Sequence, residues 1–541
     1  MKPTQKSWPD ERLDAARLIG DPEVDQLVER VLGPDETFSG VGRLGYNRLL
    51  DIADKLLEAP ELGFVESSRV RQQLKAFPQQ LVDYFDPLEA PDWVDEAKLA
   101  LVNRVWEENT LGILSVLYAA ALPYCYLMAK GIPSLYKTER LLEQKYIFQR
   151  LYETGLMLDS VMGAGGLKII ADFGEERDGS AESAPRRYVW GKGFISARKV
   201  RFLHASMRFM LTRPDLFRRR GKLEDPASFS ERLSRQTEPW PKAKLGLPVN
   251  QEDLAYTLLT FGYIIPIGLE RWGCRLSLEE KEAFLHTWKL VGHIMGIKAD
   301  LLPDNCDEAE RLFAAIKRRQ AAASQPGTEL TEALLRFLQD YLPRLPGINE
   351  ALPTVLMIDQ LGKEDAGKIL SEERRRAAEG FFVNAVYRAA RASVWLYFLV
   401  RNRLFRRFPT AAGFMGEIFH QAGDEFINSW QDAYRRSPFF IPAGAEGGGK
   451  QAYDVGEGFL KQLTLWRRRL FYTLVAGVAC LVAAAAALLL SPFLYLLLMH
   501  RAAGIAVWSS VGALLLGLAI LKFGVPTVVR RRPLPSDLKH M

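Results

Sequence analysis

The amino-acid sequence predicts an all-α protein, with a single large helical domain followed by a C-terminal transmembrane helical hairpin. Three observations predict this class. Apolar residues recur at three- and four-residue intervals along most of the chain, alternating β-branched runs are nearly absent, and two long uncharged segments lie near the C-terminus. With 48% hydrophobic and 25% charged residues, a chain of 541 residues can also bury a large core.

Charge and cysteine content exclude several classes of protein. Lys plus Arg is 71 and Asp plus Glu is 65, and the resulting net charge of +6 is too weak over this length to indicate nucleic-acid binding. The four cysteines form no CxxC pair, so the sequence contains neither a disulfide framework nor a Cys-rich metal site, which fits a reducing compartment: Cys125, Cys274, Cys306 and Cys480.

The apolar spacing predicts six helices in the N-terminal part, over residues 51–58, 141–161, 197–211, 251–269, 278–295 and 371–404. A further run, 109–129, is uncharged and long enough to cross a membrane. It lies among amphipathic helices and contains Pro123, so we interpret it as a buried central helix that is kinked or broken at this proline.

The helical domain is predicted to cover residues 1–440, with polar loops at 172–187 and 320–328. A Gly-rich linker and juxtamembrane segment follow at 441–466. The amphipathic stretch 413–440 contains His420 and has two open interpretations, because it can pack on the core or lie at a membrane surface.

The hairpin is predicted to cover residues 467–532, with spans at 471–490 and 502–521. Each span has the roughly 20 residues that a helix needs to cross the hydrocarbon core. Ser491-Pro492 is expected to end the first helix. Three arginines precede the first span and three follow the second, whereas the turn holds only Arg501 and His500. The positive-inside rule therefore predicts two spans with the helical domain on the cytoplasmic side of the membrane.

His204 is the histidine whose surroundings are most informative. Arg201, His204 and Arg208 are spaced three and four residues apart and share one face of a largely apolar helix. Such an arrangement could bind an iron porphyrin. The imidazole nitrogen would ligate the metal, and a guanidinium would pair with a propionate. Spacing alone nevertheless favours the alternative, a core histidine hydrogen-bonded to a carbonyl.

Other candidate residues remain open on spacing alone. His286 and His293 are seven residues apart, which separates their Cα atoms by about 10 Å on a helix, so helix packing beside Trp288 is the favoured interpretation. Lys137, which precedes Thr138, fits either a solvated surface group or a neutral iron ligand in an apolar pocket. No HExxH, phosphate-binding Gly-rich loop or GxSxG motif is present.

Between about residues 19 and 370, the chain resembles the oxygenase family of the MpaB-type enzymes and the latex-clearing rubber oxygenases. The order and spacing of several short motifs carry this resemblance: Gly20-Asp21-Pro22, Pro91-Asp92-Trp93, Ala121-Leu122-Pro123 with Tyr126, Leu135-Tyr136-Lys137-Thr138, Arg150 with Glu153-Thr154, Val200-Arg201-x-x-His204-Ala205-x-x-Arg208, Gly246-Leu247-Pro248-Val249-Asn250-Gln251-Glu252-Asp253-Leu254, and Gly292-His293-x-x-Gly296-Ile297.

The resemblance implies an all-helical fold with one non-covalent haem b. It implies that His204 is the axial ligand, because this residue opens the His-Ala-x-x-Arg motif, and that Lys137, followed by Thr138, is the second. Arg201 and Arg208 would then contact the cofactor. Two departures concern the substrate: Ser134 stands where the rubber enzymes have an arginine, and Tyr118 stands at the offset of their proposed catalytic glutamate, the nearest carboxylates being Glu107 and Glu108.

The expected function is that of a membrane-anchored, haem-dependent oxygenase, an oxidoreductase that uses dioxygen. After Lys137 moves away, dioxygen would react at the iron and attack a C=C bond of an apolar substrate, such as an isoprenoid or other lipid, drawn from the bilayer. Two alternatives remain: a haem-binding sensor or carrier without oxygenase activity, and a helical membrane adaptor without cofactor.

Overall fold

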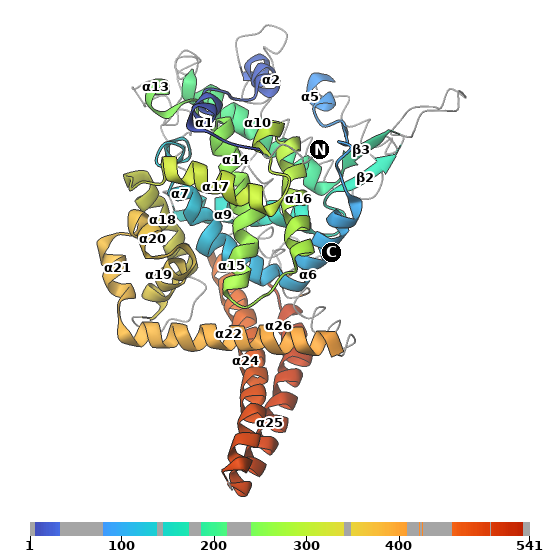
Figure 1. Cartoon of the computed structure of the whole chain (residues 1–541), viewed down its shortest axis with the longest axis vertical. Coiled ribbons are helices and arrows are strands. Elements are labelled where there is room, and N and C mark those ends of the chain that lie inside the picture. Colours follow the sequence, from blue (N-terminus) through green and yellow to red (C-terminus); the bar gives the residue numbers. More distant parts are fainter. Residues whose placement is uncertain are drawn as a thin grey trace, which may run out of the picture.

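The structure, a computed structural model, describes residues 6–32, 79–137, 144–171, 186–213, 240–339, 348–407, 421, 423, 425, 457–497 and 499–533. These residues form a helical body from which two long helices project (Figure 1). The predicted all-α class is confirmed, with one small three-stranded sheet added in the described part. The predicted helix at 51–58, the linker from 441 to 456, and both Thr138 and His420 lie outside the described residues.

The N-terminal half contains α1 (Asp10–Arg17), α2 (Pro22–Leu32), α5 (Gln79–Asp83), β1 (Leu88–Glu89), α6 (Glu96–Val116), η2 (Leu117–Ala121), α7 (Leu122–Tyr126), α8 (Ile132–Tyr136), α9 (Gln144–Met162), β2 (Lys168–Ala171), β3 (Arg187–Trp190), α10 (Lys192–Thr212) and α13 (Lys242–Leu245). The C-terminal half contains α14 (Gln251–Leu259), η3 (Thr260–Ile264), α15 (Ile265–Arg271), α16 (Leu278–Ile294), η4 (Ala299–Leu301), α17 (Cys306–Gln320), α18 (Gln325–Gln339), α19 (Ile348–Leu361), α20 (Lys363–Ile369), α21 (Glu372–Ala378), α22 (Phe381–Arg407), α24 (Glu457–Leu496), α25 (His500–Ala519), η5 (Ile520–Gly524) and α26 (Val525–Val529).

Helix α10 lies at the centre of the body. It is buried on nearly every side, and it packs against α2, α9 and α16. Helix α16 in turn packs along α6 and on η3, so the same apolar core surrounds α10 and the long α6. A capping box at Ser277 and Glu280 fixes the beginning of α16. The helix that carries His204 is therefore held in place from several directions.

Three π-helical turns of the described chain share one sequence feature, a proline two residues after the turn ends. A proline lacks the N–H that would bond the carbonyl four residues earlier, and its ring crowds that carbonyl. In each case that carbonyl belongs to the π turn, and the widened turn relieves the crowding without ending the helix. The pairs are η2 with Pro123, η3 with Pro266 and η5 with Pro526.

The first pair refines the interpretation of residues 109–129. The run is a buried central helix, as expected, and it continues from α6 through η2 into α7. The helix does not break at Pro123, because the π turn at Leu117–Ala121 accommodates the proline. Turns η2 and η3 contact each other in the core.

The small sheet has the order β1-β3-β2, and both pairings are antiparallel. Strands β2 and β3 flank the loop predicted at 172–187. Gly191, with φ of 115°, follows β3 directly, and a Cβ at this position would lie 2.6 Å from the Gly166 carbonyl oxygen. This close approach turns the chain from β3 into α10.

The C-terminal hairpin consists of α24 packed along α25 (Figure 1). Among the residues that the structure describes, two stretches are long and apolar enough to cross a membrane, Lys461–Leu496 and His500–Val529. The expectation that Ser491-Pro492 ends the first helix is wrong, because α24 continues to Leu496. Pro492 removes the hydrogen bond to the Leu488 carbonyl, and the Ser491 hydroxyl donates to that oxygen instead, at 2.8 Å.

Small residues let the two helices of the hairpin approach closely. A Cβ at Gly517 would lie 3.0 Å from the Gly477 carbonyl oxygen, and Ser510 donates a hydrogen bond across the hairpin to the Ala484 carbonyl at 2.8 Å. Both features are typical of helix pairs in membranes. At the base of the hairpin, the Trp466 indole donates to the Val528 carbonyl at 2.7 Å.

Residues 371–404 form two helices rather than the single predicted one. Helix α21 ends at Ala378 and α22 begins at Phe381, with Gly380 between them. The Asn384 side chain donates to the carbonyls of Ala378 and Gly380, which stabilises the break. Helix α22 runs across the base of the hairpin (Figure 1) and contacts α24.

Candidate functional site

A cavity of about 250 Å³ lies in the middle of the helical body, between α7, α8, α9, α10, α14 and α16. Most of its wall is apolar, including Leu122, Leu135, Leu151, Met157, Val200, Leu203, Met207, Leu254, Leu258, Phe261, Trp288, Met295 and Ile297. The volume lies just below the range of about 300–1,000 Å³ for small-molecule sites. A wall of this composition suits an apolar ligand.

His204 is the histidine that lines this cavity in the described chain. It does so with Val200, Leu203 and Met207, which are spaced along α10 so that they form one stripe. His204 is half-buried, whereas the other three belong to the apolar core or pack on it. The structure therefore presents one imidazole to an otherwise largely apolar space.

Arg201 does not line the cavity, contrary to the expected contact with a cofactor. Its Nε donates to Oδ2 of Asp21 at 2.6 Å and its Nη2 donates to Oδ1 at 2.9 Å, while Glu23 accepts a further bond at 2.7 Å. Burial opposes the charge on Arg201, but the hydrogen bonds and charge of Asp21 outweigh it and raise the pKa of this guanidinium.

Arg208 is likewise bound elsewhere. Its Nε lies 2.9 Å from Oδ1 of Asp25, and its Nη1 donates to the carbonyls of Pro248 and Val249. The physical reason is angular. At 100° per residue, Arg201 and Arg208 lie on one side of His204, and the stripe of Val200, Leu203 and Met207 lies on the other. Although Arg201 and Arg208 share a broad face of α10 with His204, their guanidiniums therefore do not lie on the cavity wall.

The motifs scattered through the sequence meet around these arginines. Gly20 approaches so closely that a Cβ there would lie 2.6 Å from Arg208 Nε. Gly296, with φ of 75°, lies equally close to Arg201 and Asp21. The Gln251 side chain donates to the carbonyls of Gly20 and Gly296, which ties three distant segments together. These motif residues hold α10 in place rather than forming the cavity.

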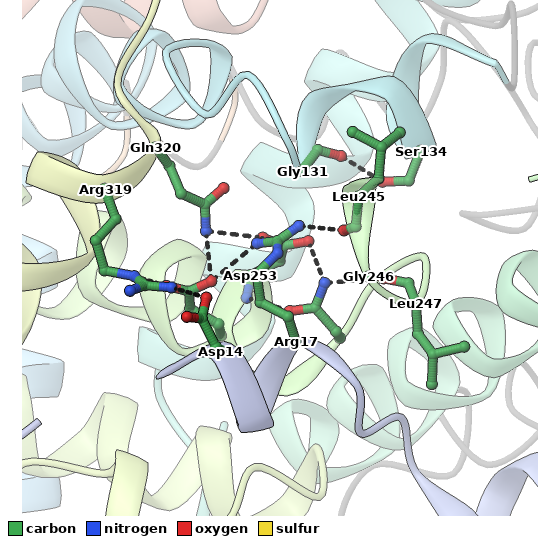
Figure 2. Close-up of polar contacts among 12 residues, drawn as sticks. Asp14, Arg17, Gly131, Ser134, Leu245, Gly246, Leu247, Asp253, Arg319 and Gln320 are labelled. Atoms are coloured by element: carbon green, nitrogen blue, oxygen red, sulfur yellow. Dashed lines mark hydrogen bonds and ion pairs between the residues drawn. The ribbon is translucent and has the colours of Figure 1, made fainter. Parts of the chain in front are cut away.

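Asp253 is a carboxylate on the cavity wall that the sequence did not reveal as a site residue. Figure 2 shows the polar network around it. Arg17 Nη1 donates to its Oδ1 at 2.8 Å, Asn250 Nδ2 donates to its Oδ2 at 2.7 Å, and Gln320 donates at 3.3 Å. The sequence placed Asp253 in a family motif near the beginning of a predicted helix, but two of its partners, Arg17 and Gln320, come from distant segments.

Behind Asp253, the network continues through the buried Glu252. Arg17, Arg319 and Gln320 all donate to its carboxylate, at 2.9, 3.1 and 2.8 Å. Burial raises the pKa of Glu252, and the hydrogen bond and charge of Arg17 oppose this rise. Because each carboxylate oxygen of Glu252 and Asp253 accepts from a guanidinium or an amide, the network is a rigid support for Asp253.

Gly131 leaves the room that Asp253 needs. A Cβ at this glycine would lie 2.8 Å from Oδ1 of Asp253, as their proximity in Figure 2 indicates. Gly131 lies at the beginning of α8, whose Ile132, Ser134 and Leu135 also line the cavity. The Ser134 hydroxyl donates to the Gly131 carbonyl at 2.7 Å.

Lys137 follows α8 directly but is not part of the cavity wall. Its ammonium lies over the Trp240 ring, with Nζ 5.6 Å from the ring centroid. The structure therefore does not bring Lys137 and His204 together at the cavity. Thr138, the other residue of this pair, lies outside the described residues.

His286 and His293 have a structural role. Both rings pack edge-on against Trp93, with centroids 5.5 and 6.2 Å away, and His286 Nε2 accepts the Asp95 backbone N–H at 3.0 Å. Burial, followed by the charges of Lys98 and Lys289, lowers the pKa of His286 to about 4. The favoured interpretation as packing residues is correct, although the aromatic partner is Trp93.

The two positions that depart from the family pattern also have defined places. Tyr118 is buried in η2, and its hydroxyl donates to the Leu151 carbonyl at 3.0 Å. Glu107 and Glu108 lie on α6 and do not line the cavity. Among the residues that the structure describes, no three His, Cys, Asp or Glu side chains gather in a way that would hold a bare metal ion.

Comparisons with known proteins match the C-terminal part of the helical body. Residues 186–392 match the family model described as "ER-bound oxygenase mpaB/B'/Rubber oxygenase, catalytic domain". A rubber oxygenase of Streptomyces sp. (strain K30) is 24% identical over 152 residues, which are 28% of this chain and 32% of that protein. The match thus spans about a third of the length of this relative.

A solved structure of latex clearing protein LCP in the closed state shares 17% sequence identity, with a TM-score of 0.47, and the match covers 79% of this chain and 95% of that one. The matched region 186–392 contains α10 with His204, the Asp253 network and α16. It also contains the motifs on which the resemblance depends from Val200 onward. Residues 186–392 of this chain are therefore similar to the catalytic domains of the ER-bound oxygenase mpaB/B′ and rubber oxygenase family, which supports the resemblance found in the sequence.

Proposed function

We propose that this protein is a membrane-anchored, haem-dependent oxygenase that uses dioxygen to attack a C=C bond of an apolar substrate. The observation that carries the proposal is the position of His204, a single imidazole on the wall of an apolar cavity, within the region that matches the family model. The Streptomyces relative is a rubber oxygenase, and an apolar wall of this kind suits a hydrocarbon of the same general chemistry.

The donor set of the cavity fits a haem better than a bare metal ion. A protein-built metal site needs three or four ligands, and the described residues provide no such group. A porphyrin brings four nitrogens of its own, so one histidine is sufficient, and the apolar wall suits the macrocycle. A bound haem would supply the redox chemistry that activates dioxygen.

The side chains of the cavity would divide the remaining tasks. His204 would hold the cofactor through one ring nitrogen, and the ion pairs of Arg201 and Arg208 would fix the helix that carries it. Leucine, methionine and aromatic side chains would exclude water and position an apolar substrate. Asp253, supported by Arg17 and Asn250, would orient a polar group at one end of the cavity.

The pair Lys137 and Thr138 stays a proposal. Three residues of α8 line the cavity just before Lys137, so a change at the end of this helix would bring the amine toward it. The amine would have to leave the Trp240 ring to ligate a cofactor. Lys137→Ala in haem-loaded protein tests this role, because loss of a second axial ligand shifts the absorption spectrum.

We further propose that the hairpin spans the membrane twice, with the helical body on the cytoplasmic side. Arginines flank both ends of the hairpin at its base, next to the body, and the turn carries Arg501 and His500. Labelling of single cysteines with an impermeant maleimide in intact cells tests the orientation. A cysteine at Met499 should react from outside, and one at Arg531 should react only after the cells are opened.

A haem-binding sensor or carrier is the second candidate function. It is favoured by Tyr118 and Ser134, which stand where the rubber enzymes have an acid and an arginine and which are both engaged in local hydrogen bonds. Dioxygen uptake by haem-loaded protein with a polyprenyl substrate separates the two functions. Uptake with a cleaved product supports the oxygenase, and a stable Soret band without uptake supports the carrier.

A further inference from the structure

A second cavity, of about 400 Å³, lies between the base of the hairpin and the helical body. Its wall is almost entirely apolar, with α6, α19, α22 and α24 each contributing residues. Leu470, Phe471 and Leu474 of α24 belong to this wall, as do Leu111 and Leu114 of α6, and Leu111 packs against the cluster that contains Leu470 and Leu474. A volume of this size accommodates one small molecule or one hydrocarbon chain.

The position of the cavity relates it to the bilayer. Leu470 and Phe471 directly follow the three arginines 467–469, where the apolar span begins. Helix α22, which lines the cavity with Tyr387 and Val394, runs across the hairpin at this level (Figure 1). It also exposes large apolar side chains, with Phe381 at 89%. If the hairpin spans a membrane, α22 lies at the surface and the cavity opens next to the lipid.

The charge on the wall restricts the head group of a ligand. Arg391 is the charged residue of the cavity lining in the described chain. Its Nη1 lies 2.6 Å from Oδ1 of Asp359, and its Nη2 donates to the Arg271 carbonyl at 3.4 Å. This guanidinium is already neutralised, so the wall provides no unpaired cation for a phosphate. An uncharged lipid fits these walls better than a phospholipid.

Tyr118 lies between the two cavities. Its ring belongs to the wall of the second cavity, and it contacts Phe337 edge-on with centroids 5.4 Å apart. Its hydroxyl donates to the carbonyl of Leu151, whose side chain lines the first cavity. Leu122 and Cys125, the next turn of the same continuous helix, also line the first cavity. The inner end of the second cavity thus borders the proposed reaction site.

We infer that the second cavity receives the single hydrocarbon chain of an uncharged lipid directly from the bilayer, and that this chain is held between the hairpin and α22 before it reaches the first cavity. The inference rests on the proposed oxygenase function, for which it names the class of substrate and its route of entry. It depends on the second cavity and the hairpin, and not on His204.

Photolabelling tests the inference in the full-length protein reconstituted into phosphatidylcholine nanodiscs. The probe is a C20 prenyl alcohol with a diazirine near the end of its chain. We expect labelled peptides from α6, α22 and the beginning of α24, and competition by unlabelled prenyl alcohol. Labelling confined to the outer surface of the hairpin, equal labelling by a diazirine phospholipid, or a cross-link to another polypeptide would overturn the inference.

Two neighbouring alanines of α22 provide a matched pair of variants. Both side chains are exposed, but Ala390 lines the cavity and Ala389 does not. We expect Ala390→Trp to reduce labelling at least tenfold and Ala389→Trp to leave it unchanged. Equal labelling of the two variants would contradict the inference. If Ala390→Trp does not fold, Val394→Phe fills the same space with a smaller change, and the same comparison applies.

His204→Ala separates the failure of this inference from that of the proposed function. This variant should lose the haem spectrum and keep the labelling, because His204 belongs to the first cavity. Labelling in a protein that never binds haem would support the lipid site while refuting the oxygenase. A haem-loaded, active protein without labelling in the second cavity would support the oxygenase while refuting the lipid site.

Discussion

Asp21 holds Arg201 in a buried, two-point ion pair, with Nε to Oδ2 at 2.6 Å and Nη2 to Oδ1 at 2.9 Å. Arg201 lies one helical turn before His204, and the Asp25–Arg208 pair lies one turn after it. The segment around Gly20 therefore fixes α10 on both sides of the histidine that faces the cavity. These two ion pairs connect the Gly20-Asp21-Pro22 segment to the Val200–Arg208 motif, and the paired residues are 180 and 183 positions apart in the sequence.

Removing the Asp21 charge should destabilise the protein substantially. Asp21→Asn leaves a buried guanidinium without its main partner, and breaking a buried pair in this way costs about 3–5 kcal/mol. Glu23 remains as a partner, which places the expected loss near the lower end. The measurement is thermal unfolding in detergent, followed by circular dichroism.

Glu23→Gln is the control for Asp21→Asn. Glu23 also bonds Arg201, but its side chain is 68% exposed, so its loss should cost less than about 1 kcal/mol. A Glu23 variant as unstable as the Asp21 variant would show that the buried pair does not anchor α10.

Gly131→Ala should disturb the Asp253 network. The new methyl group would overlap Oδ1 of Asp253, which cannot move freely because Arg17, Asn250 and Gln320 hold it. We expect a loss of about 1–3 kcal/mol, as for other overpacked sites, measured as a lower melting temperature. Gly367→Ala, in a helix with nothing within 4 Å, should be neutral or slightly stabilising. Equal effects of the two substitutions would argue against a rigid network.

Stability should fall as the pH drops below neutrality. The pKa of His286 is lowered to about 4, and that of His293 is also lowered by burial, so the folded state keeps both rings neutral. The unfolded chain takes up protons near pH 6.5, so stability is complete above that value and is lost as the pH falls toward 4. For His286 this loss amounts to at most about 3 kcal/mol.

His286→Gln tests the origin of this pH dependence. Glutamine does not titrate, and its oxygen can still accept the Asp95 N–H. The difference in melting temperature between pH 7.5 and pH 5 should therefore shrink in the variant. An unchanged difference would mean that other groups cause the acid sensitivity.

The geometry of the hairpin predicts a specific disulfide. An ideal Cβ at Gly517 lies 3.1 Å from Cβ of Cys480, so a shift of a few tenths of an ångström reaches the separation of roughly 3.5–4.5 Å in disulfides, whereas Gly512 has nothing within 4 Å. Mild oxidation of Gly517→Cys should therefore form an intramolecular bond with Cys480, detected by mass spectrometry. Gly512→Cys should form none. A bond in the second variant only would mean that the helices pack in a different register.

The sequence was sufficient to predict the elements that depend on local pattern. The helical class, α10, α16 and the two apolar C-terminal helices all follow from spacing and charge. The prediction that the first helix ends at Ser491-Pro492 was wrong because the Ser491 hydroxyl donates to the carbonyl that Pro492 leaves without a backbone donor. The spacing of apolar residues does not reveal this hydrogen bond. The resemblance was drawn over about residues 19–370, and it overlaps the region 186–392 that the family model matches from residue 186 onward.

The site was only partly predictable. His204 faces the cavity as the motif suggested, but whether it binds a cofactor stays a prediction. Arg201 and Arg208 were expected beside the cofactor, and only their tertiary partners, Asp21 and Asp25, show that they anchor the helix instead. Asp253 was missed because its role depends on residues from two distant segments, which a single sequence does not bring together.

The absorption spectrum of the detergent-extracted protein, purified with haemin supplied during expression, tests the central claim most directly. We predict a Soret band at one haem per chain, and its loss in His204→Ala with an unchanged circular dichroism spectrum. Met207→Ala, which changes an apolar neighbour in the same cavity wall, should keep the band. A colourless wild-type protein, or an unchanged band in His204→Ala, would contradict the assignment of His204 as the haem ligand.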